Sequence, residues 1–174
     1  MISAFLLIGA ASAGEPVDCA WSEGMPWCTA TVTIDAPTAK VEGILSNFSG
    51  LPDIFPRIAS SSVLAENTIY VVLEMPFPLV PRDYIAKFTR EEVGDEVRLH
   101  WVAVEHPDAP AHESRVRLLN TAGTWTLRAE TESSTEVIYR WNAELGGDIP
   151  SWALSRAWQL QGDEVLARLK SAAE

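Results

Sequence analysis

The stretch YVVLEMPFPLVPRDYIAKFT, from Tyr70 to Thr89, is the most informative part of this chain. Two extended segments flank a loop that contains three prolines, Pro76, Pro78 and Pro81. Because proline fixes φ and offers no backbone donor, this loop cannot run as a central strand of a sheet. We expect a stiff hairpin connection whose apolar side chains close over a core or a pocket: Met75, Phe77, Leu79 and Val80.

Length and charge restrict the class of protein. The chain has 174 residues, which suits one domain that buries roughly 70% of its unfolded surface and can still enclose a cavity. The net charge of −11 argues against nucleic-acid binding, which needs a basic surface, and against strong attraction to anionic lipids. We therefore expect a monomer whose membrane contacts, if any, are transient and hydrophobic.

The N-terminus has the pattern of a targeting segment. Residues 1–11 are almost wholly apolar, and Ala11-Ser12-Ala13 matches a small-residue cleavage site. The apolar run is shorter than the ~20 residues that a membrane-spanning helix needs. We expect a signal peptide over residues 1–13 and an exported protein, although the basic start of such peptides is missing and an apolar N-terminal strand is the alternative.

The only two cysteines, Cys19 and Cys28, follow soon after the expected cleavage site. In an exported protein they are expected to pair and to tie the mature N-terminus to the first strand. In a cytosolic protein they would be two free thiols. A single pair with no neighbouring histidine does not predict a zinc site.

Hydrophobic periodicity predicts an α+β chain. A strand follows Cys28, and two short helical segments follow within residues 36–56. Antiparallel strands then fill most of the chain; we expect them at 58–64, 68–74, 84–91, 96–104, 114–129 with a turn near Ala122-Gly123, and 135–145. A long amphipathic helix closes the chain from about residue 151 to 172, with Asp148 and Pro150 at its start.

A sheet of this length must curl, and its concave face needs a cover that only the last helix is long enough to supply. The predicted architecture is thus a curved sheet that grips one helix around a tunnel. Gly162 interrupts the apolar stripe of that helix, which predicts a close approach to the sheet or to a bound molecule.

Three motifs in this order resemble the START family of lipid-transfer domains, within the helix-grip superfamily that also contains polyketide cyclase-like proteins. The motifs are Arg82-Asp83-Tyr84 at the start of a strand, Gly123-Thr124-Trp125-Thr126, and the run from Gly146 to Trp152 before the last helix. The resemblance covers residues 28–174, with residues 14–27 as an N-terminal extension. It implies a single lipid or other hydrophobic molecule held in a tunnel, with no metal, no cofactor and no covalent chemistry.

Sterol-binding relatives of that family place an arginine six residues after the arginine of the first motif. Phe88 occupies this position here, so the resemblance does not extend to sterol specificity.

Strand alternation and the tryptophan content predict which side chains line the tunnel. Side chains of a strand alternate between faces, and the faces without lysine or arginine should point inward. On this basis we expect a wall made of Tyr84, Phe88, Trp101, Tyr139 and Trp141, to which Trp125 and Trp158 are added because their elements face the tunnel. Met75, Phe77 and Leu79 are expected in a gate formed by the proline loop together with residues 47–56.

Several charged and polar residues are candidates for structural, catalytic or metal-binding roles. Arg82 and Asp83 are interpreted as a structural pair that fixes the hairpin, with a ligand head group as the alternative partner. His100 and Glu74 are the only acid–base candidates for a cyclase-like enzyme, and neither is well placed by alternation. His106 and His112 lie in a proline-containing loop that we expect to be solvated rather than metal-binding. A protein-binding module without a ligand is the remaining alternative.

Overall fold

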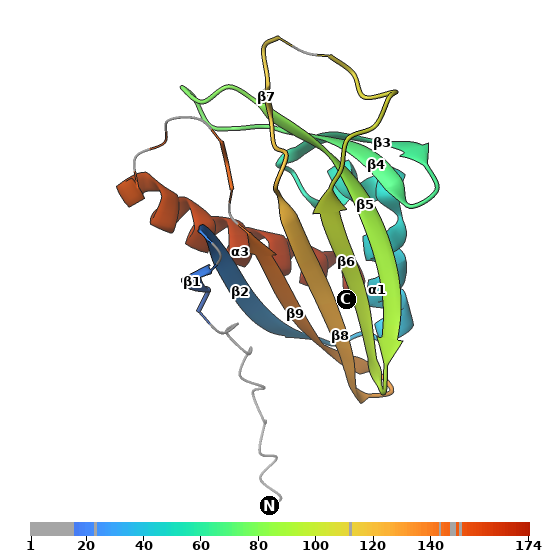
Figure 1. Cartoon of the computed structure of the whole chain (residues 1–174). Helices are drawn as coiled ribbons and strands as arrows, with labels where there is room; N and C mark the ends of the chain where they lie inside the picture. Colours follow the sequence, from blue (N-terminus) through green and yellow to red (C-terminus); the bar gives the residue numbers. More distant parts are fainter. Residues whose placement is uncertain (1–15, 23, 112, 143, 147–148, 150) are drawn as a thin grey trace, which may run out of the picture.

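The computed structural model describes residues 16–22, 24–111, 113–142, 144–146, 149 and 151–174. A curled sheet wraps around one long helix, and the smaller helical segments that follow the second strand pack on the same concave side, in one core with that helix (Figure 1). The strands are β1 Asp18–Ser22, β2 Met25–Ile34, β3 Ile58–Ala65, β4 Thr68–Leu73, β5 Arg82–Val93, β6 Glu96–Ala103, β7 Val116–Arg117, β8 Ala122–Thr131 and β9 Ser134–Asn142. The helices are α1 Thr38–Ser46, the 3-10 turn η1 Phe48–Gly50, α2 Leu51–Ile54 and α3 Ser151–Ala173.

The strand order across the sheet is β1-β2-β9-β8-β6-β5-β4-β3, and every neighbouring pair in it is antiparallel. The short strand β7 is the exception, because it pairs with the start of β5 in parallel. The order brings β9, near the C-terminus, beside β2, near the N-terminus, so the sheet curls until α3 can cover its concave face. The predicted fold class, a curved antiparallel sheet gripping a C-terminal helix, is confirmed.

Regular alternation builds the core on the concave face. Every second residue of β2 is buried from Pro26 to Ile34, and β8 and β9 show the same period over most of their length. Helix α3 packs against this part of the sheet through Trp158, Leu166 and Leu169. The period of two for strands and 3.6 for helices therefore explains most of the core.

Two element boundaries differ from those expected. Strand β1 and the start of β2 form a hairpin within residues 18–27, which we expected to be an extension outside the domain. The turn expected near Ala122-Gly123 lies earlier, because Gly123 is a buried residue inside β8. Glycine is needed there for a close contact with Trp101 and not for a turn, as described below. The expected signal peptide, Asp148 and Pro150 lie outside the described residues.

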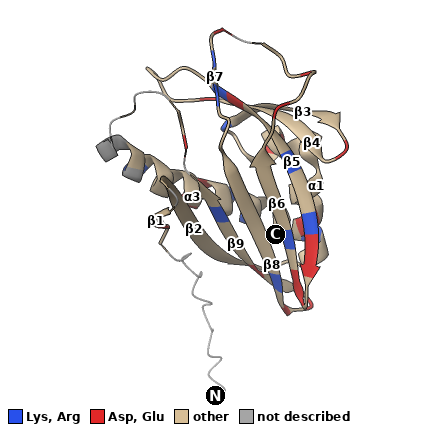
Figure 2. Ribbon diagram, in the orientation of Figure 1, with Lys and Arg blue, Asp and Glu red and all other residues tan. Residues whose placement is uncertain are grey.

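The end of the sheet that holds the β5–β6 and β8–β9 turns is strongly charged, as Figure 2 shows. Arg128 bridges Glu96 and Glu136, and Arg98 also contacts Glu96, across three neighbouring strands. Such partly exposed pairs contribute little stability individually. Within the part of the chain described, no helix combines the length and the apolar character that crossing a bilayer requires.

Cys19 and Cys28 form a disulfide, as predicted. The two residues are direct partners in the β1–β2 ladder. All five residues of β1 are exposed, so this strand gains little from apolar burial. The neighbouring residue Val17 nevertheless packs on the core, where it lies close to Gly162 of α3. The disulfide is therefore the main restraint that holds the N-terminal segment against the helix.

Replacement of both cysteines by serine should release β1 without unfolding the domain. The physical reason is that the hairpin loses its covalent restraint while β2 stays paired with β9. Hydrogen–deuterium exchange should show faster exchange of the β1 amides and unchanged exchange in β8 and β9. Equally fast exchange throughout the sheet would contradict this local role.

Candidate ligand-binding cavity

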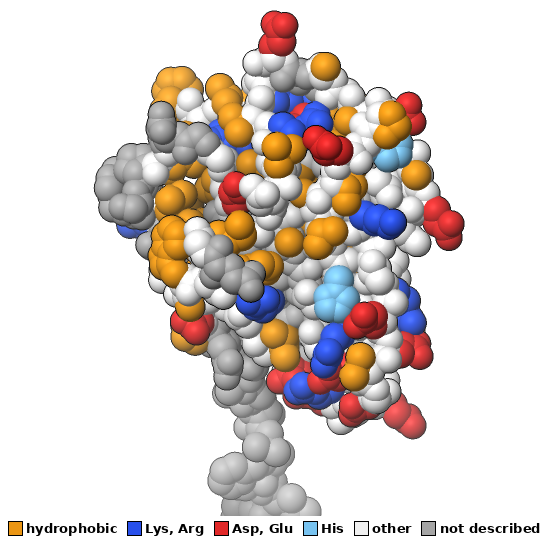
Figure 3. All heavy atoms as spheres, viewed as in Figure 1, with side chains coloured by type: hydrophobic (Ala, Val, Ile, Leu, Met, Phe, Trp, Pro, Cys, Tyr) orange, Lys and Arg blue, Asp and Glu red, His pale blue; other side chains and the backbone are white. Residues whose placement is uncertain are grey.

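A cavity of about 370 Å³ lies between the concave face of the sheet and α3. Its volume falls in the range of ~300–1,000 Å³ typical of small-molecule sites. Its lining is mostly aliphatic and aromatic, and comes from β4, β5, β6, β8, β9, the segment around α2, the proline loop and α3. In the space-filling view of Figure 3, hydrophobic side chains gather on the side of the molecule where α3 begins, away from the charged end of the sheet.

Six of the seven aromatic residues expected in the tunnel wall line this cavity. They are Tyr84, Phe88, Trp101, Trp125, Tyr139 and Trp141, supplied by four strands. Trp158 is buried in the core and is not among the lining residues. Residues of a helix differ by about 100° per position because a turn holds 3.6 residues. Ala157, one position earlier on α3, faces the cavity in its place, together with Gln161 and Val165.

The wall is organised by ring stacking. Tyr139 stacks on Trp125 with ring centroids 3.9 Å apart and on Trp141 with centroids 4.5 Å apart. Two indole rings cannot share one face of a phenol ring at these distances, so they cover opposite faces of Tyr139. Tyr84 stacks on Trp101 at 5.7 Å. Offset stacking of this kind contributes about 0.5–1.5 kcal/mol per pair beyond simple burial.

Glycines allow two of these rings to approach the backbone. A Cβ atom at Gly123 would lie 2.7 Å from the indole of Trp101, and one at Gly162 would lie 2.7 Å from Trp141. Distances this short are not tolerated between carbon atoms, so any other residue would displace the ring. Gly162 therefore provides the close approach of α3 to the sheet that the sequence predicted.

The proline loop contributes to the wall and to the surface. Met75, Pro76 and Leu79 line the cavity, whereas Phe77 is 97% exposed at the loop tip. Leu51 and Phe55, from the expected second gate segment, also line it. The two segments expected to form a gate thus both border the cavity.

Arg82 is buried and holds the base of this loop. Its guanidinium donates to the backbone carbonyl of Val80 in the loop, and to the carbonyls of Leu145 and Gly146 at 2.9 and 3.1 Å. Burial lowers the pKa of Arg82 below its usual value, although the group stays charged at any physiological pH. Arg82 therefore connects the proline loop to the segment that leads into α3, and it makes no contact with Asp83.

Asp83 lies on the opposite face of β5 in a separate network. Its carboxylate accepts hydrogen bonds from Arg117, at 2.5 and 3.0 Å, and from the hydroxyl of Tyr70 at 2.7 Å. Arg115 donates to the same hydroxyl, and Arg117 also donates to the carbonyl of Pro110. The network attaches the loop after β6 to the outside of the sheet. The expected pair of Arg82 and Asp83 is thus two separate structural arrangements.

Polar lining residues that strand alternation did not identify gather toward the ends of β8 and β9. Thr121 and Asn142 are buried, and Glu144 is held by the backbone and side-chain nitrogens of Asn120 at 3.1 and 3.2 Å. Arg57, the one basic lining residue described, is paired with Glu164 of α3 at 2.7 Å. These residues lie in loops and at strand ends, where side chains follow no regular period. Their place in the cavity lining could therefore not be predicted from the sequence pattern.

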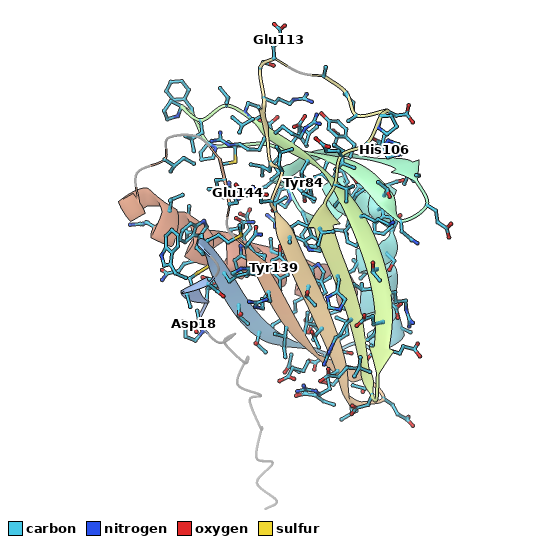
Figure 4. All side chains as sticks on the ribbon, viewed as in Figure 1. Asp18, Tyr84, His106, Glu113, Tyr139 and Glu144 are labelled. Carbon is cyan, nitrogen blue, oxygen red and sulfur yellow. A yellow bond between two sulfur atoms is a disulfide. The ribbon has the colours of Figure 1, made fainter. Side chains whose placement is uncertain are left out.

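The histidine candidates for catalysis or metal binding that the structure describes lie outside the cavity lining, whereas the candidate Glu74 is part of it. His100 is outside the lining and contacts Thr124 at 2.9 Å and Glu91 at 3.2 Å. His106 lies on the loop beyond β6 (Figure 4), and His112 is outside the described residues. Glu74 lines the cavity beside Arg57 and Met75. Among the described residues, no group of three or more potential ligands is arranged to hold a metal ion.

Two phenol groups in the wall are strongly desolvated. Burial raises the pKa of Tyr84 above its usual value of 10.0. Burial likewise raises the pKa of Tyr139, and the nearby hydroxyl of Tyr84 raises it further. Both phenols are therefore neutral at physiological pH.

Comparison with known proteins agrees with this geometry. An uncharacterized protein of Pseudomonas aeruginosa, PA1579, is 27% identical over 146 residues, which cover 81% of this chain and 72% of that protein. The crystal structure of a STAR-related lipid transfer protein from Xanthomonas axonopodis has a TM-score of 0.75 and 24% identity, covering 90% of this chain and 98% of that one. Human StAR-related lipid transfer protein 5 has a TM-score of 0.78 and 13% identity, covering 94% and 84%.

A family model described as "Polyketide cyclase / dehydrase and lipid transport" matches residues 25–174. The chain belongs to this family, and its fold is the START-like helix grip. The resemblance deduced from the sequence motifs is confirmed.

The network around Asp83 predicts a pH-dependent contribution to stability. Burial alone would raise the pKa of Asp83, but hydrogen bonds from Arg117 and Tyr70 outweigh it and hold the pKa below its usual range. A lowered folded-state pKa means that the contribution is complete above the unfolded-state pKa of about 3.9 and is lost as pH falls through the lower folded-state value. We expect Asp83→Asn to reduce the free energy of unfolding by about 2–3 kcal/mol at pH 7.

Urea denaturation followed by tryptophan fluorescence would measure this change at pH 7 and at pH 3. The gap between wild type and Asp83→Asn should narrow at pH 3. Glu91→Gln is the matched control, because Glu91 is an exposed carboxylate on the same strand, and we expect a change within about 0.5 kcal/mol. Equal effects of the two substitutions would contradict the assigned network.

Proposed function

We propose that this protein binds one lipid or other hydrophobic small molecule in the cavity and carries or presents it without chemical change. Membership of a family associated with hydrophobic ligands supports the general class of function. The observation that supports the proposal most directly is the aromatic wall inside a cavity of about 370 Å³. Transfer of a ligand's hydrocarbon from water to this wall is worth about 25 cal/mol per Å² of apolar surface buried.

The alternative is a helix-grip enzyme, such as a cyclase, that acts on a hydrophobic substrate, since the family description includes cyclases and dehydrases. General acid–base catalysis is most often carried out by a histidine within hydrogen-bond reach of the substrate. Among the described lining residues, Glu74 and Glu144 are the only acidic groups and there is no histidine. His100, the other candidate, is hydrogen-bonded outside the cavity. This arrangement favours the carrier over the enzyme.

The disulfide between Cys19 and Cys28 is consistent with export to an oxidising compartment, where such bonds persist. We include export in the proposal, with residues 1–13 as the signal peptide. Mass spectrometry of the protein recovered from its natural host is the test. A mature chain that starts at Gly14 supports export, and a chain that retains Met1 argues against it.

Ligand entry requires an opening, and we place it at the proline loop and residues 47–56. Both segments border the cavity and include apolar residues. Phe77, exposed at the loop tip, and Val80, half exposed, are suited to brief insertion into the apolar layer of a membrane. Arg82 holds the base of the loop in place, so movement would be confined to the tip.

Native mass spectrometry of gently purified protein tests the binding proposal. We expect an added mass that corresponds to one hydrophobic molecule, and its loss after organic extraction. Incubation of the extracted protein with methyl dodecanoate should restore an added mass at one-to-one stoichiometry. An empty chain that takes up no hydrophobic probe would overturn the carrier, whereas release of a chemically altered probe would favour the enzyme.

A substitution at the loop tip should slow the transfer of ligand between membranes without changing the affinity for the ligand. Phe77→Asp should slow transfer of a pyrene-labelled methyl ester between phosphatidylcholine vesicles by about tenfold or more, because inserting a phenyl side chain is worth roughly 1.5–3 kcal/mol. The affinity for the ester should not change, since Phe77 does not line the cavity. Val93→Asp is the control, because Val93 is also an exposed apolar residue but ends β5 at the opposite end of the sheet. Equal transfer rates for both variants would exclude the loop as the membrane contact.

A further inference from the structure

Two of the three tyrosines of the chain, Tyr84 and Tyr139, contribute their side chains to the cavity wall. Neither hydroxyl group makes a hydrogen bond to any described residue. Tyr139 is 7% exposed, and Tyr84 is partly buried. Both hydroxyls are open to the cavity that their side chains line, because neither is a fully buried atom.

The third tyrosine of the chain shows that this pattern is not general. Tyr70 is equally buried, at 6% exposure, but lies on the other side of the sheet. Its hydroxyl donates to Asp83 and accepts from Arg115. The two tyrosines without partners are thus the two that line the cavity.

Stacking fixes what Tyr139 can offer to a ligand. Trp125 and Trp141 cover its two faces, so the ring cannot receive a ligand or a cation on either of them. Its free end is the hydroxyl. Tyr84 comes from β5, and strands β6 and β8 lie between β5 and β9 in the sheet. Figure 4 shows both labelled tyrosines within the outline of the curled sheet.

The described part of the cavity lining offers no unpaired basic side chain. The charged lining residues are Arg57, Glu74 and Glu144, and Arg57 is already paired with Glu164. An anionic head group in this region would have no counter-charge, and burying an unpaired ion is far more costly than burying a neutral oxygen.

We propose that the cavity selects a neutral amphiphile, in which an uncharged oxygen of a carbonyl, ester or hydroxyl group binds the hydroxyl of Tyr84 or of Tyr139. This inference rests on the proposed function and adds the class of ligand. The phenols act as donors to a carbonyl oxygen, and as donor and acceptor to a hydroxyl group. The aromatic rings hold the hydrocarbon, while the ligand's oxygen supplies the partners that the protein does not. Fatty carboxylates and lipids whose phosphate would enter this region are excluded.

A matched series of probes tests the selection in the full-length protein. Dodecane, methyl dodecanoate and dodecanoate share a chain and differ in having no oxygen, a neutral ester or a carboxylate. Quenching of tryptophan fluorescence at pH 8, with each probe delivered from cyclodextrin, gives the affinities. We expect the ester to bind at least tenfold more tightly than dodecanoate and about three- to tenfold more tightly than dodecane, as expected for hydrogen bonds to neutral partners.

Three tyrosine-to-phenylalanine variants test whether the preference for the ester depends on particular tyrosine hydroxyls. Tyr84→Phe and Tyr139→Phe should each reduce the preference for the ester over dodecane by about three- to tenfold, with unchanged affinity for dodecane. Tyr70→Phe is the matched control and should leave the preference unchanged. The melting temperatures of the ligand-free proteins give a second readout. Tyr70→Phe should lower the melting temperature, because its hydroxyl is hydrogen-bonded, whereas the other two substitutions should leave it equal or higher.

The outcomes separate this inference from the proposed function. If dodecanoate binds as tightly as the ester, or if the Tyr84 and Tyr139 variants keep the wild-type preference, the neutral-ligand assignment is wrong while the carrier remains. If none of the three probes binds, both proposals fail. Lowered melting temperatures for Tyr84→Phe and Tyr139→Phe, with an unchanged preference, would assign their hydroxyls a structural role.

Discussion

Stacking among Trp125, Tyr139 and Trp141 keeps the interior of this protein open. Large side chains on a concave sheet would ordinarily reach across and fill the space, because protein interiors pack densely. Here each ring finds its contacts in the neighbouring ring on the same wall, at centroid distances of 3.9 and 4.5 Å. The rings pack against one another and leave the space between the sheet and the helix open. The cavity exists because of this packing.

Helix α3 also packs against the sheet in a way that leaves the cavity open. It touches the sheet closely where Gly162 lies against Trp141, and it is held further along by Leu166 and Leu169. The neighbouring helical positions Ala157, Gln161 and Val165 turn toward the cavity. One helix therefore seals the core with one stripe and completes the cavity with the next. A shift of one residue in its rotation would exchange the two roles.

The sequence predicts those features that follow from a local period or a local motif. Alternation along β6 and β9 is enough to assign Trp101, Tyr139 and Trp141 to one face, because the period of two does not depend on the rest of the fold. The side of α3 that carries Trp158 could not be assigned in the same way. Adjacent helical positions differ by about 100°, so a small rotation set by tertiary packing decides between core and cavity.

Long-range partners escaped prediction for a related reason. Asp83 is bound by Arg117 and Tyr70, which are 34 and 13 residues away in the sequence. Their meeting depends on the loop after β6 crossing the outer face of the sheet. The buried carbonyls that Arg82 contacts belong to residues 63 and 64 positions away. Neither pairing has a signal in residue type or spacing, whereas the fold class and the disulfide do.

The two borders of the sheet also bear on how copies of this chain meet one another. An unpaired outer strand offers a row of free amides and carbonyls, on which a second molecule can continue the sheet and begin to aggregate. One border is β1, only five residues long and fastened by the Cys19–Cys28 bond. The other is β3, whose register shifts between Ile58 and Ser60 and again between Val63 and Ala65. The short length of β1 and the irregular register of β3 therefore both discourage such growth.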